Sequence, residues 1–304
     1  MPASVPFKVK SISQLHELRG LPRPQHPLIS VIDLQDVKLP EEPVKQTAVL
    51  DFYSISVKQG TRLKYKYGQQ QYDFDEGVMF FTAPGQVIGI ESDKDATHTG
   101  WVLFIHPDFL WNTALAKTIK KFEFFDYAVN EALFLSEKEE RILNGLLSLI
   151  KQEYSSNVDK FSQDIIISQI EVMLNYAERF YHRQFITRRA ANHQILDKLE
   201  QWLDDYFANE KQVTDGLPAV QDIADALNMS PTYLGAMLKA LTGLSTQQHI
   251  HEKLIEKAKE KLSTTSLTVS EVAYQLGFEH SQSFNKLFKA KTNQSPLEFR
   301  KAFN

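Results

Sequence analysis

Apolar and polar residues alternate in four short runs between Ala48 and Phe109. Alternation over this length is typical of strands that bury one face, and glycines or a Pro-Gly pair interrupt it at hairpin intervals, at 60, 68, 77 and 84–85. The runs are LDFYSISV at 50–57, KQGTRLKYKYG at 58–68, GVMFFTAPGQVIGI at 77–90 and TGWVLFIHP at 99–107. Strands connected in this way close most simply as a compact β-barrel or sandwich.

Two amphipathic helices are predicted after the strands. The first covers 136–154, where Ser136 and Glu139 have the spacing of a capping box. Its apolar stripe consists of Ile142, Leu143, Leu146, Leu147 and Ile150. The second covers 161–185 and carries a stripe of Ile166, Ile170, Leu174 and Ala177. This stripe is broad enough to pack into a core and also against a partner subunit, and the pattern does not choose between the two.

Residues 186–194, ITRRAANHQ, have little apolar periodicity, so we expect them to link two domains. From 195 onward the pattern is helical, and we expect seven helices. The first ends near Asn209, and its apolar residues are Ile195, Leu199, Trp202, Leu203 and Phe207. The predicted organisation is therefore one domain over 1–185, a linker over 186–194 and a second domain over 195–304, which suits a chain of 304 residues.

Residues 220–241 predict a helix-turn-helix unit. Ala224 is small where two helices cross closely, and Asn228, four residues later, tolerates the left-handed backbone of a sharp turn. Ser230 can cap a second helix that begins at Pro231, the position where a missing N–H costs nothing. The anchors of that helix are Leu234, Met237 and Leu238. This geometry places the second helix in a DNA major groove.

The same pattern returns at 267–291. Thr268 and Glu271 form a capping box, while Ala273 and Gly277 take the roles of the alanine and the turn residue of the first unit. The anchors are Phe284, Leu287 and Phe288, and the two alanines lie 49 positions apart (224 and 273). The chain therefore contains a degenerate repeat of one helix-turn-helix unit.

A helix without Gly or Pro is predicted between the two units, at 245–262. Ile250, Leu254, Ala258 and Leu262 recur along it at helical spacing. Eighteen residues at about 1.5 Å each give a rod of about 27 Å, near the ~34 Å of one duplex turn. One chain could thus fill two successive major grooves.

Together these motifs resemble the DNA-binding module of the AraC/XylS family of transcription regulators. The resemblance covers 220–301 and is carried by LIEKAKEKLSTTSLTVSEVAYQLGF, FNKLFKAKT and SPLEFR. It implies a sequence-specific regulator that binds double-stranded DNA. Many family members carry Arg where this chain has Leu254 and Gly where it has Asn293. Loss of that Arg would remove a salt bridge or a phosphate contact, while the apolar anchors keep the fold.

The N-terminal part resembles the cupin-like sensor domains that commonly precede this module, through DEGVMFFTAPGQ at 75–86 and the helices after it. The implied fold class is α+β with two domains: a cupin-like β-barrel followed by helices, then an all-α module with two helix-turn-helix units joined by a linker helix. The resemblance also implies a homodimer and control by a small-molecule effector through the N-terminal domain. RNA polymerase is a further partner that such a regulator could contact.

With the anchors turned inward, we expect twelve residues on the exposed faces to touch DNA. On the first recognition helix they are Ser230, Thr232, Tyr233, Gly235, Ala236 and Lys239, and on the second His280, Ser281, Gln282, Asn285, Lys286 and Lys289. Gly235 and Ala236 make no side-chain hydrogen bonds, so the first helix should discriminate less. Gln and Asn amides can pair with adenine, and Lys can reach guanine or phosphate. Gln282, Asn285 and Lys286 are the expected main readers, and the alternative for each is a solvated polar side chain.

Charge supports this division of roles. The formal net charge is -4, but residues 231–304 hold ten Lys/Arg against six Asp/Glu, which is +4 and leaves -8 for residues 1–230. Cysteine is absent, which excludes disulfides, thiolate catalysis and Cys-ligated zinc. No apolar run approaches the roughly 18 residues of a membrane helix, and the start, MPASVPFKVK, lacks the apolar stretch of a secretory signal. We therefore expect a cytoplasmic protein without a membrane partner.

Two alternative functions remain at the level of sequence. A metal-dependent cupin enzyme would need clustered His and carboxylate ligands, but the strand region holds only His98 and His106, and His249 and His251 point to different sides of a helix. We accordingly expect no enzyme activity, metal or cofactor. A DNA-binding adaptor without an effector is the second alternative. The default place for an effector pocket is the barrel interior from Phe52 to Phe104, whose aromatic residues could equally be plain core. The effector, the operator and the direction of regulation are not encoded in recognisable motifs.

Overall fold

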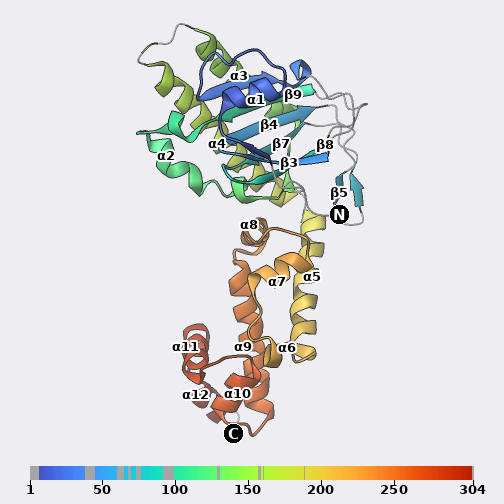
Figure 1. Cartoon of the computed structure of the whole chain (residues 1–304). Coiled ribbons are helices and arrows are strands. Elements are labelled where there is room, and N and C mark those ends of the chain that lie inside the picture. Colours follow the sequence, from blue (N-terminus) through green and yellow to red (C-terminus); the bar gives the residue numbers. More distant parts are fainter. Residues whose placement is uncertain are drawn as a thin grey trace. The chain divides into compact units, whose positions relative to one another are not determined.

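The chain forms two units. The computed structural model describes residues 7–37, 45–59, 65–67, 70–72, 77–91, 99–128, 131–156, 159, 161–187 and 189–302. Contacts within the chain divide it into an N-terminal unit, Met1–Gln184, and a C-terminal unit, Phe185–Asn304 (Figure 1). None of the described helices has the length and apolar character needed to cross a membrane.

A five-stranded antiparallel sheet forms the centre of the N-terminal unit. Its order is β10-β7-β4-β9-β2, and its register places Ile55 opposite both Leu103 and Phe81. A second sheet has the order β1-β3-β8, with β1 parallel and β8 antiparallel to β3. The strands are β1 (Phe7–Val9), β2 (Ile29–Asp33), β3 (Lys45–Leu50), β4 (Tyr53–Gln59), β5 (Tyr65–Tyr67), β6 (Gln70–Tyr72), β7 (Val78–Thr82), β8 (Val87–Glu91), β9 (Thr99–Ile105) and β10 (Leu133–Phe134), of which β5 and β6 pair with each other.

Both faces of the five-stranded sheet are covered. On one face, Trp101 Nε1 donates to Asn144 Oδ1 of α3 (Glu137–Ser155) at 2.8 Å, and the Phe81 ring lies near Tyr181 of α4 (Ser162–Thr187). The opposite face packs on α1 (Ile12–Leu18) and the second sheet. There the rings of Phe52 and Phe104 meet edge to face, 5.5 Å between centroids. These two aromatic residues therefore belong to the core.

The expected barrel is not confirmed. Among the described strands neither sheet closes on itself, and β2 and β10 are the edges of the larger one. The run at 50–57 is not one strand, because Asp51 and Phe52 turn the chain from one sheet into the other. The run at 77–90 divides into two strands at Pro84-Gly85, as the interruption of its alternation predicts, and Gly85 has a φ of +86°. Residues 60–64 and 68, inside the run at 58–68, lie outside the described residues.

The two long helices of this unit agree with their patterns. Ser136 and Glu139 form the predicted capping box, and Leu143, Leu147 and Ile150 are buried. On α4 the whole predicted stripe, Ile166, Ile170, Leu174 and Ala177, is buried. The shorter helical elements are α2 (Ala114–Thr118) and 3-10 turns at Leu34–Asp36, Pro107–Leu110, Ile119–Lys121 and Glu123–Asp126.

Residues 186–194 are helical wherever they are described. Helix α4 ends at Thr187 and α5 begins at Arg189, and buried Asn192 donates its amide to the Phe185 carbonyl oxygen at 2.7 Å. This hydrogen bond fixes the start of α5 without an apolar stripe in the sequence, so the apolar periodicity of the sequence did not predict a helix here. The division into a linker and two domains at these bounds stays a prediction.

Eight helices begin within 189–302, where we expected seven from 195 onward. The additional one is α6, a single turn after Glu210, which has a left-handed backbone with a φ of 53°. Four residues are too few for a detectable period. The helices are α5 (Arg189–Ala208), α6 (Lys211–Thr214), α7 (Val220–Ala226), α8 (Pro231–Thr242), α9 (Thr246–Thr264), α10 (Val269–Gln275), α11 (Ser281–Thr292) and α12 (Pro296–Lys301).

Candidate nucleic-acid interface

The first helix-turn-helix unit consists of α7 and α8. Ala224 is fully buried between the helices, and Asn228 has the left-handed φ of 54° that its position predicts. The Ser230 hydroxyl accepts the backbone N–H of Tyr233 at 3.2 Å, and Pro231 is the first helical residue. The cap, the proline and the turn therefore start α8 where the sequence indicates.

The second unit consists of α10 and α11. Thr268 and Glu271 form the predicted capping box, and Ala273 is fully buried. Gly277 has a φ of +88°, so it takes the turn position that Asn228 holds in the first unit. Helix α11 ends at Thr292, and Asn293 follows it as a C-cap with the left-handed φ of 60°.

Helix α9 joins the two units. Ser245 and Gln248 cap its first turn, and the predicted anchors Ile250, Leu254, Ala258 and Leu262 are all buried. Leu254 is 1% exposed, so its side chain packs as an apolar anchor. Lys253 Nζ lies 2.7 Å from Asp204 Oδ1 of α5, which ties α9 to the helix that precedes both units.

The turn of the second unit is packed against α6. Gln212 Nε2 donates to the Gln275 carbonyl oxygen at 3.2 Å, and Tyr206 Oη donates to the Gly216 carbonyl oxygen at 3.0 Å. A Cβ on Gly277 would lie 2.7 Å from the Gln212 carbonyl oxygen. Glycine is therefore needed at 277 for close approach as well as for its backbone conformation. No sequence pattern pointed to this contact.

On α8 the candidate residues differ in exposure. Lys239 is exposed, while Ser230, Thr232, Gly235 and Ala236 are half-buried. Tyr233 is 3% exposed, so its expected place on the outer face is wrong. Its ring packs edge to face on Phe185, 5.2 Å between centroids, on the same side as Met237 one turn later. Tyr233 therefore acts as an anchor of α8.

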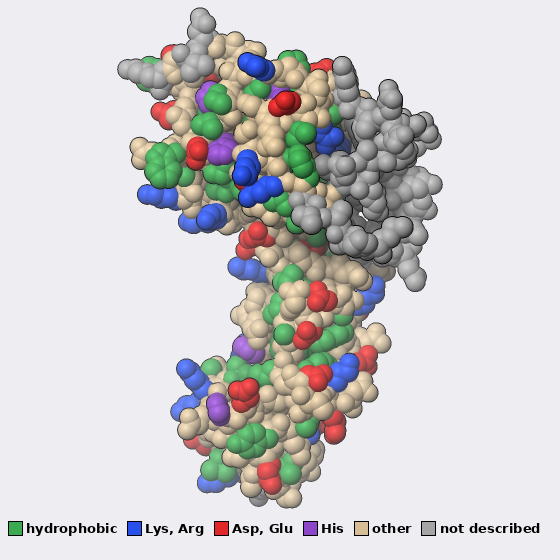
Figure 2. All heavy atoms as spheres, viewed as in Figure 1, with side chains coloured by type: hydrophobic (Ala, Val, Ile, Leu, Met, Phe, Trp, Pro, Cys, Tyr) green, Lys and Arg blue, Asp and Glu red, His purple; other side chains and the backbone are tan. Residues whose placement is uncertain are grey.

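On α11 the packing and the outward faces separate cleanly. Phe284 and Phe288 are 1% and 0% exposed, and their rings lie 5.7 Å apart. Ser281 is half-buried, and the outward residues are His280, Gln282, Asn285, Lys286 and Lys289. Figure 2 shows basic and histidine side chains together over α11. The outward face combines amide groups with ammonium groups, a combination suited to base edges and phosphates.

Lysine charge on these helices is not neutralised locally. Lys239, Lys286, Lys289 and Lys291 form no ion pair with a described carboxylate. Lys291 was not among the predicted contacts, although the charge excess of residues 231–304 includes it. It lies in the last turn of α11 and lowers the pKa of His251, whose burial is the larger cause of that shift. Because the lowered pKa keeps His251 neutral, the positive charge of this surface comes from the exposed lysines.

The remaining histidines of interest have ordinary local partners. His249 Nε2 lies 2.9 Å from Thr242 Oγ1, and His251 Nε2 lies 3.1 Å from Gln247 Nε2. His106 Nδ1 lies 3.4 Å from Asp108 Oδ2. His98 lies outside the described residues.

Comparisons with known proteins agree with this geometry. Residues 223–302 match a family described as a helix-turn-helix domain. The HTH-type transcriptional activator RhaS of Enterobacter sp. (strain 638) is 33% identical over 105 residues, which cover 34% of this chain and 35% of that protein. Residues 223–302 therefore form a helix-turn-helix domain of the AraC/XylS type, the type found in DNA-binding transcription regulators.

A second curated relative and a solved structure are also similar to part of the chain. RhaS of Citrobacter koseri is 29% identical over 140 residues, 46% of this chain and 45% of that protein. The C-terminal domain of the two-component response regulator yesN from Fusobacterium nucleatum is 27% identical, with a TM-score of 0.30, and covers 34% of this chain and 95% of that domain. The chain spans between about a third and just under half of the length of the curated relatives it matches.

Proposed function

We propose that this AraC-type regulator reads specific duplex DNA with α8 and α11, forms a homodimer through its N-terminal unit and responds there to a small molecule. The proposal describes a regulator without enzymatic activity. Its main support is α11, where two phenylalanines hold the helix in the core while amides and lysines stay exposed. A helix built in this way can enter a major groove without disturbing its own packing.

Two substitutions on α11 separate its proposed contact with the DNA backbone from its proposed contact with the bases. Lys286→Ala should weaken binding to all duplexes and reduce the salt slope by about 0.9, the value for one lost phosphate contact. Gln282→Ala should instead relax base preference at one position, by about 1–3 kcal/mol of discrimination. Fluorescence anisotropy at several salt concentrations and a binding-site selection measure the two effects. Lys138→Ala, at an exposed position of α3, is the charge-matched control. If Lys286→Ala behaves like that control, α11 is not the reading helix.

The α4 surface supports self-association. Phe161, just before α4, and Ile165 and Val172 on it are 56%, 43% and 41% exposed. Their spacing of four and seven residues places them along one outer stripe of the helix, apart from the buried stripe. Pairing this stripe with its copy around a two-fold axis would remove it from water.

The stripe can be tested by light scattering on the full chain. Val172→Asp would bury a carboxylate in such a contact, so we expect it to yield monomers where the unaltered chain yields dimers. Glu178→Lys, which changes the charge on another side of α4, should leave the mass unchanged. A dimer that persists in Val172→Asp assigns self-association to another surface.

A further inference from the structure

A cavity of about 430 Å³ lies in the N-terminal unit, away from the sheet interior between Phe52 and Phe104. Its apolar lining consists of Leu28, Ile29, Phe109, Trp111 and Ile166, from the start of β2, the 3-10 turn after β9 and helix α4. This volume is in the range of small-molecule sites, which are mostly apolar with a few polar groups. No sequence pattern indicated it, because its walls come from three distant segments.

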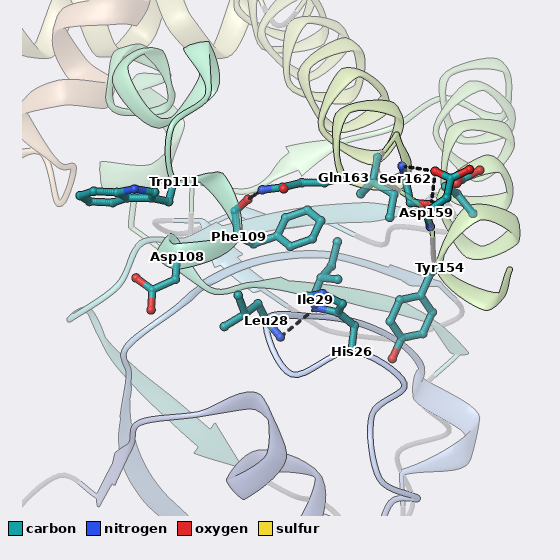
Figure 3. Close-up of a pocket in the computed structure, with 12 residues that line it drawn as sticks. His26, Leu28, Ile29, Asp108, Phe109, Trp111, Tyr154, Asp159, Ser162 and Gln163 are labelled. Atoms are coloured by element: carbon teal, nitrogen blue, oxygen red, sulfur yellow. Dashed lines mark hydrogen bonds between the residues drawn. The ribbon is translucent and has the colours of Figure 1, made fainter. Parts of the chain in front are cut away.

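The walls are held in place by their own hydrogen bonds (Figure 3). Gln163 Nε2 donates to the Phe109 carbonyl oxygen at 2.7 Å, and the rings of His26 and Phe109 meet edge to face at 5.4 Å. Tyr154 Oη accepts the Gln25 backbone N–H at 2.8 Å, which leaves its own proton to donate elsewhere. Because these side chains are already held in place, binding a ligand would cost little conformational entropy of the lining residues.

The charge of the lining is entirely negative. Asp108, Glu153 and Asp159 line the cavity, and its lining contains no Lys or Arg. Asp159 Oδ1 accepts the backbone N–H groups of Phe161 and Ser162, while its Oδ2 has no partner among the described residues. Figure 3 places Asp108 and Trp111 on one side of Phe109 and Asp159 on the other. A carboxylate thus lies towards each end of the apolar lining of the cavity.

The histidine of the lining does not offset this charge. His26 Nδ1 accepts the Leu28 backbone N–H at 3.1 Å, so the ring proton is on Nε2. Burial lowers the pKa of His26, which keeps the ring neutral near pH 7. An anion in the cavity would face three carboxylates without a cationic partner, whereas a cation would be attracted by all three.

We propose that this cavity binds a small organic amine, with its ammonium group at the carboxylates and its apolar body on Phe109, Ile29 and Ile166. The Trp111 ring, at the edge of the cavity and 78% exposed, can cover an aromatic body or face the ammonium group. The effector role of such an amine rests on the proposed function. Its binding to the cavity does not.

The test is calorimetric titration of the full chain, without DNA, with three compounds of similar shape: phenethylamine, 2-phenylethanol and phenylacetate. We expect the amine to bind at least about tenfold more tightly than the alcohol, because the alcohol can donate to a carboxylate but lacks the ammonium charge, and we expect the acid to bind most weakly. Quenching or enhancement of Trp111 fluorescence gives a second readout, which Trp111→Phe should abolish. Equal affinity for amine and alcohol would overturn the proposal.

Two further variants locate the binding site. Glu153→Gln should weaken amine binding by roughly tenfold, whereas Glu178→Gln, on α4 outside the lining, should not change it. Equal affinities of these two variants would also overturn the proposal. DNA affinity measured without amine reports on the proposed function separately. Intact DNA binding with no amine binding therefore refutes this inference alone, and amine binding with no DNA binding refutes the proposed function alone.

Discussion

Replacing Gly277 by alanine tests how tightly α6 constrains the second helix-turn-helix unit. The φ of +88° at this position costs a residue with a side chain about 1–2 kcal/mol. The new Cβ would lie 2.7 Å from the Gln212 carbonyl oxygen and 3.0 Å from the Gly216 carbonyl carbon. Both are backbone atoms and cannot rotate away, so repacking adds about 1–3 kcal/mol. The expected loss of free energy of unfolding in α10 and α11 is about 2–5 kcal/mol.

Gly243 provides a matched control. It ends α8 with a φ of +77°, and a Cβ there meets nothing within 4 Å. Gly243→Ala should therefore lose only the backbone contribution of about 1–2 kcal/mol. Hydrogen exchange of the full chain, followed by mass spectrometry, measures both changes locally. We expect amides of α10 and α11 to exchange about 30- to 4,000-fold faster in Gly277→Ala, and those of α8 about 5- to 30-fold faster in Gly243→Ala. Equal acceleration would refute the argument that α6 restricts position 277.

Two further predictions concern ionised groups. Arg183→Met removes a guanidinium that lies 2.7 Å from both Glu139 Oε2 and the Phe134 carbonyl oxygen, so thermal unfolding should show a loss of about 1–3 kcal/mol, and an unchanged midpoint would contradict it. For Glu271, the backbone N–H and then the hydroxyl of Thr268 lower the carboxyl pKa. Its contribution to the start of α10 is therefore present above the ordinary value of 4.5 and is lost as the pH falls through the lowered folded pKa. Glu271→Gln should remove this acid dependence from hydrogen exchange in α10, and an unchanged pH profile would count against the cap.

The C-terminal module was predictable because its signals are local. A capping box at Thr268, a proline at the first helical position and left-handed Asn or Gly each act within a few residues, and all were found where the pattern placed them. Tyr233 was misplaced because tyrosine suits either face of a helix. The ring that buries it belongs to Phe185, which lies far from α8 in sequence.

The N-terminal unit was less predictable because its pairing is non-local. The three-residue β1 is too short to show alternation, and it pairs with β3 about forty positions later. The turn at Asp51 and Phe52 contains no glycine or proline, so two strands were taken for one. The cavity could not be predicted either, since residues near 26, 109 and 163 meet only in the folded chain.

The separation of roles on α11 has a consequence for how such a regulator can change. Phe284 and Phe288 secure the helix, while Gln282, Asn285 and Lys286 contribute little to the interior. Under the proposed function, substitutions at those three positions should therefore alter the preferred operator with little effect on folding, typically within about 0.5 kcal/mol for exposed sites. A gene duplicate could acquire new target promoters by single steps, each of which leaves a stable protein.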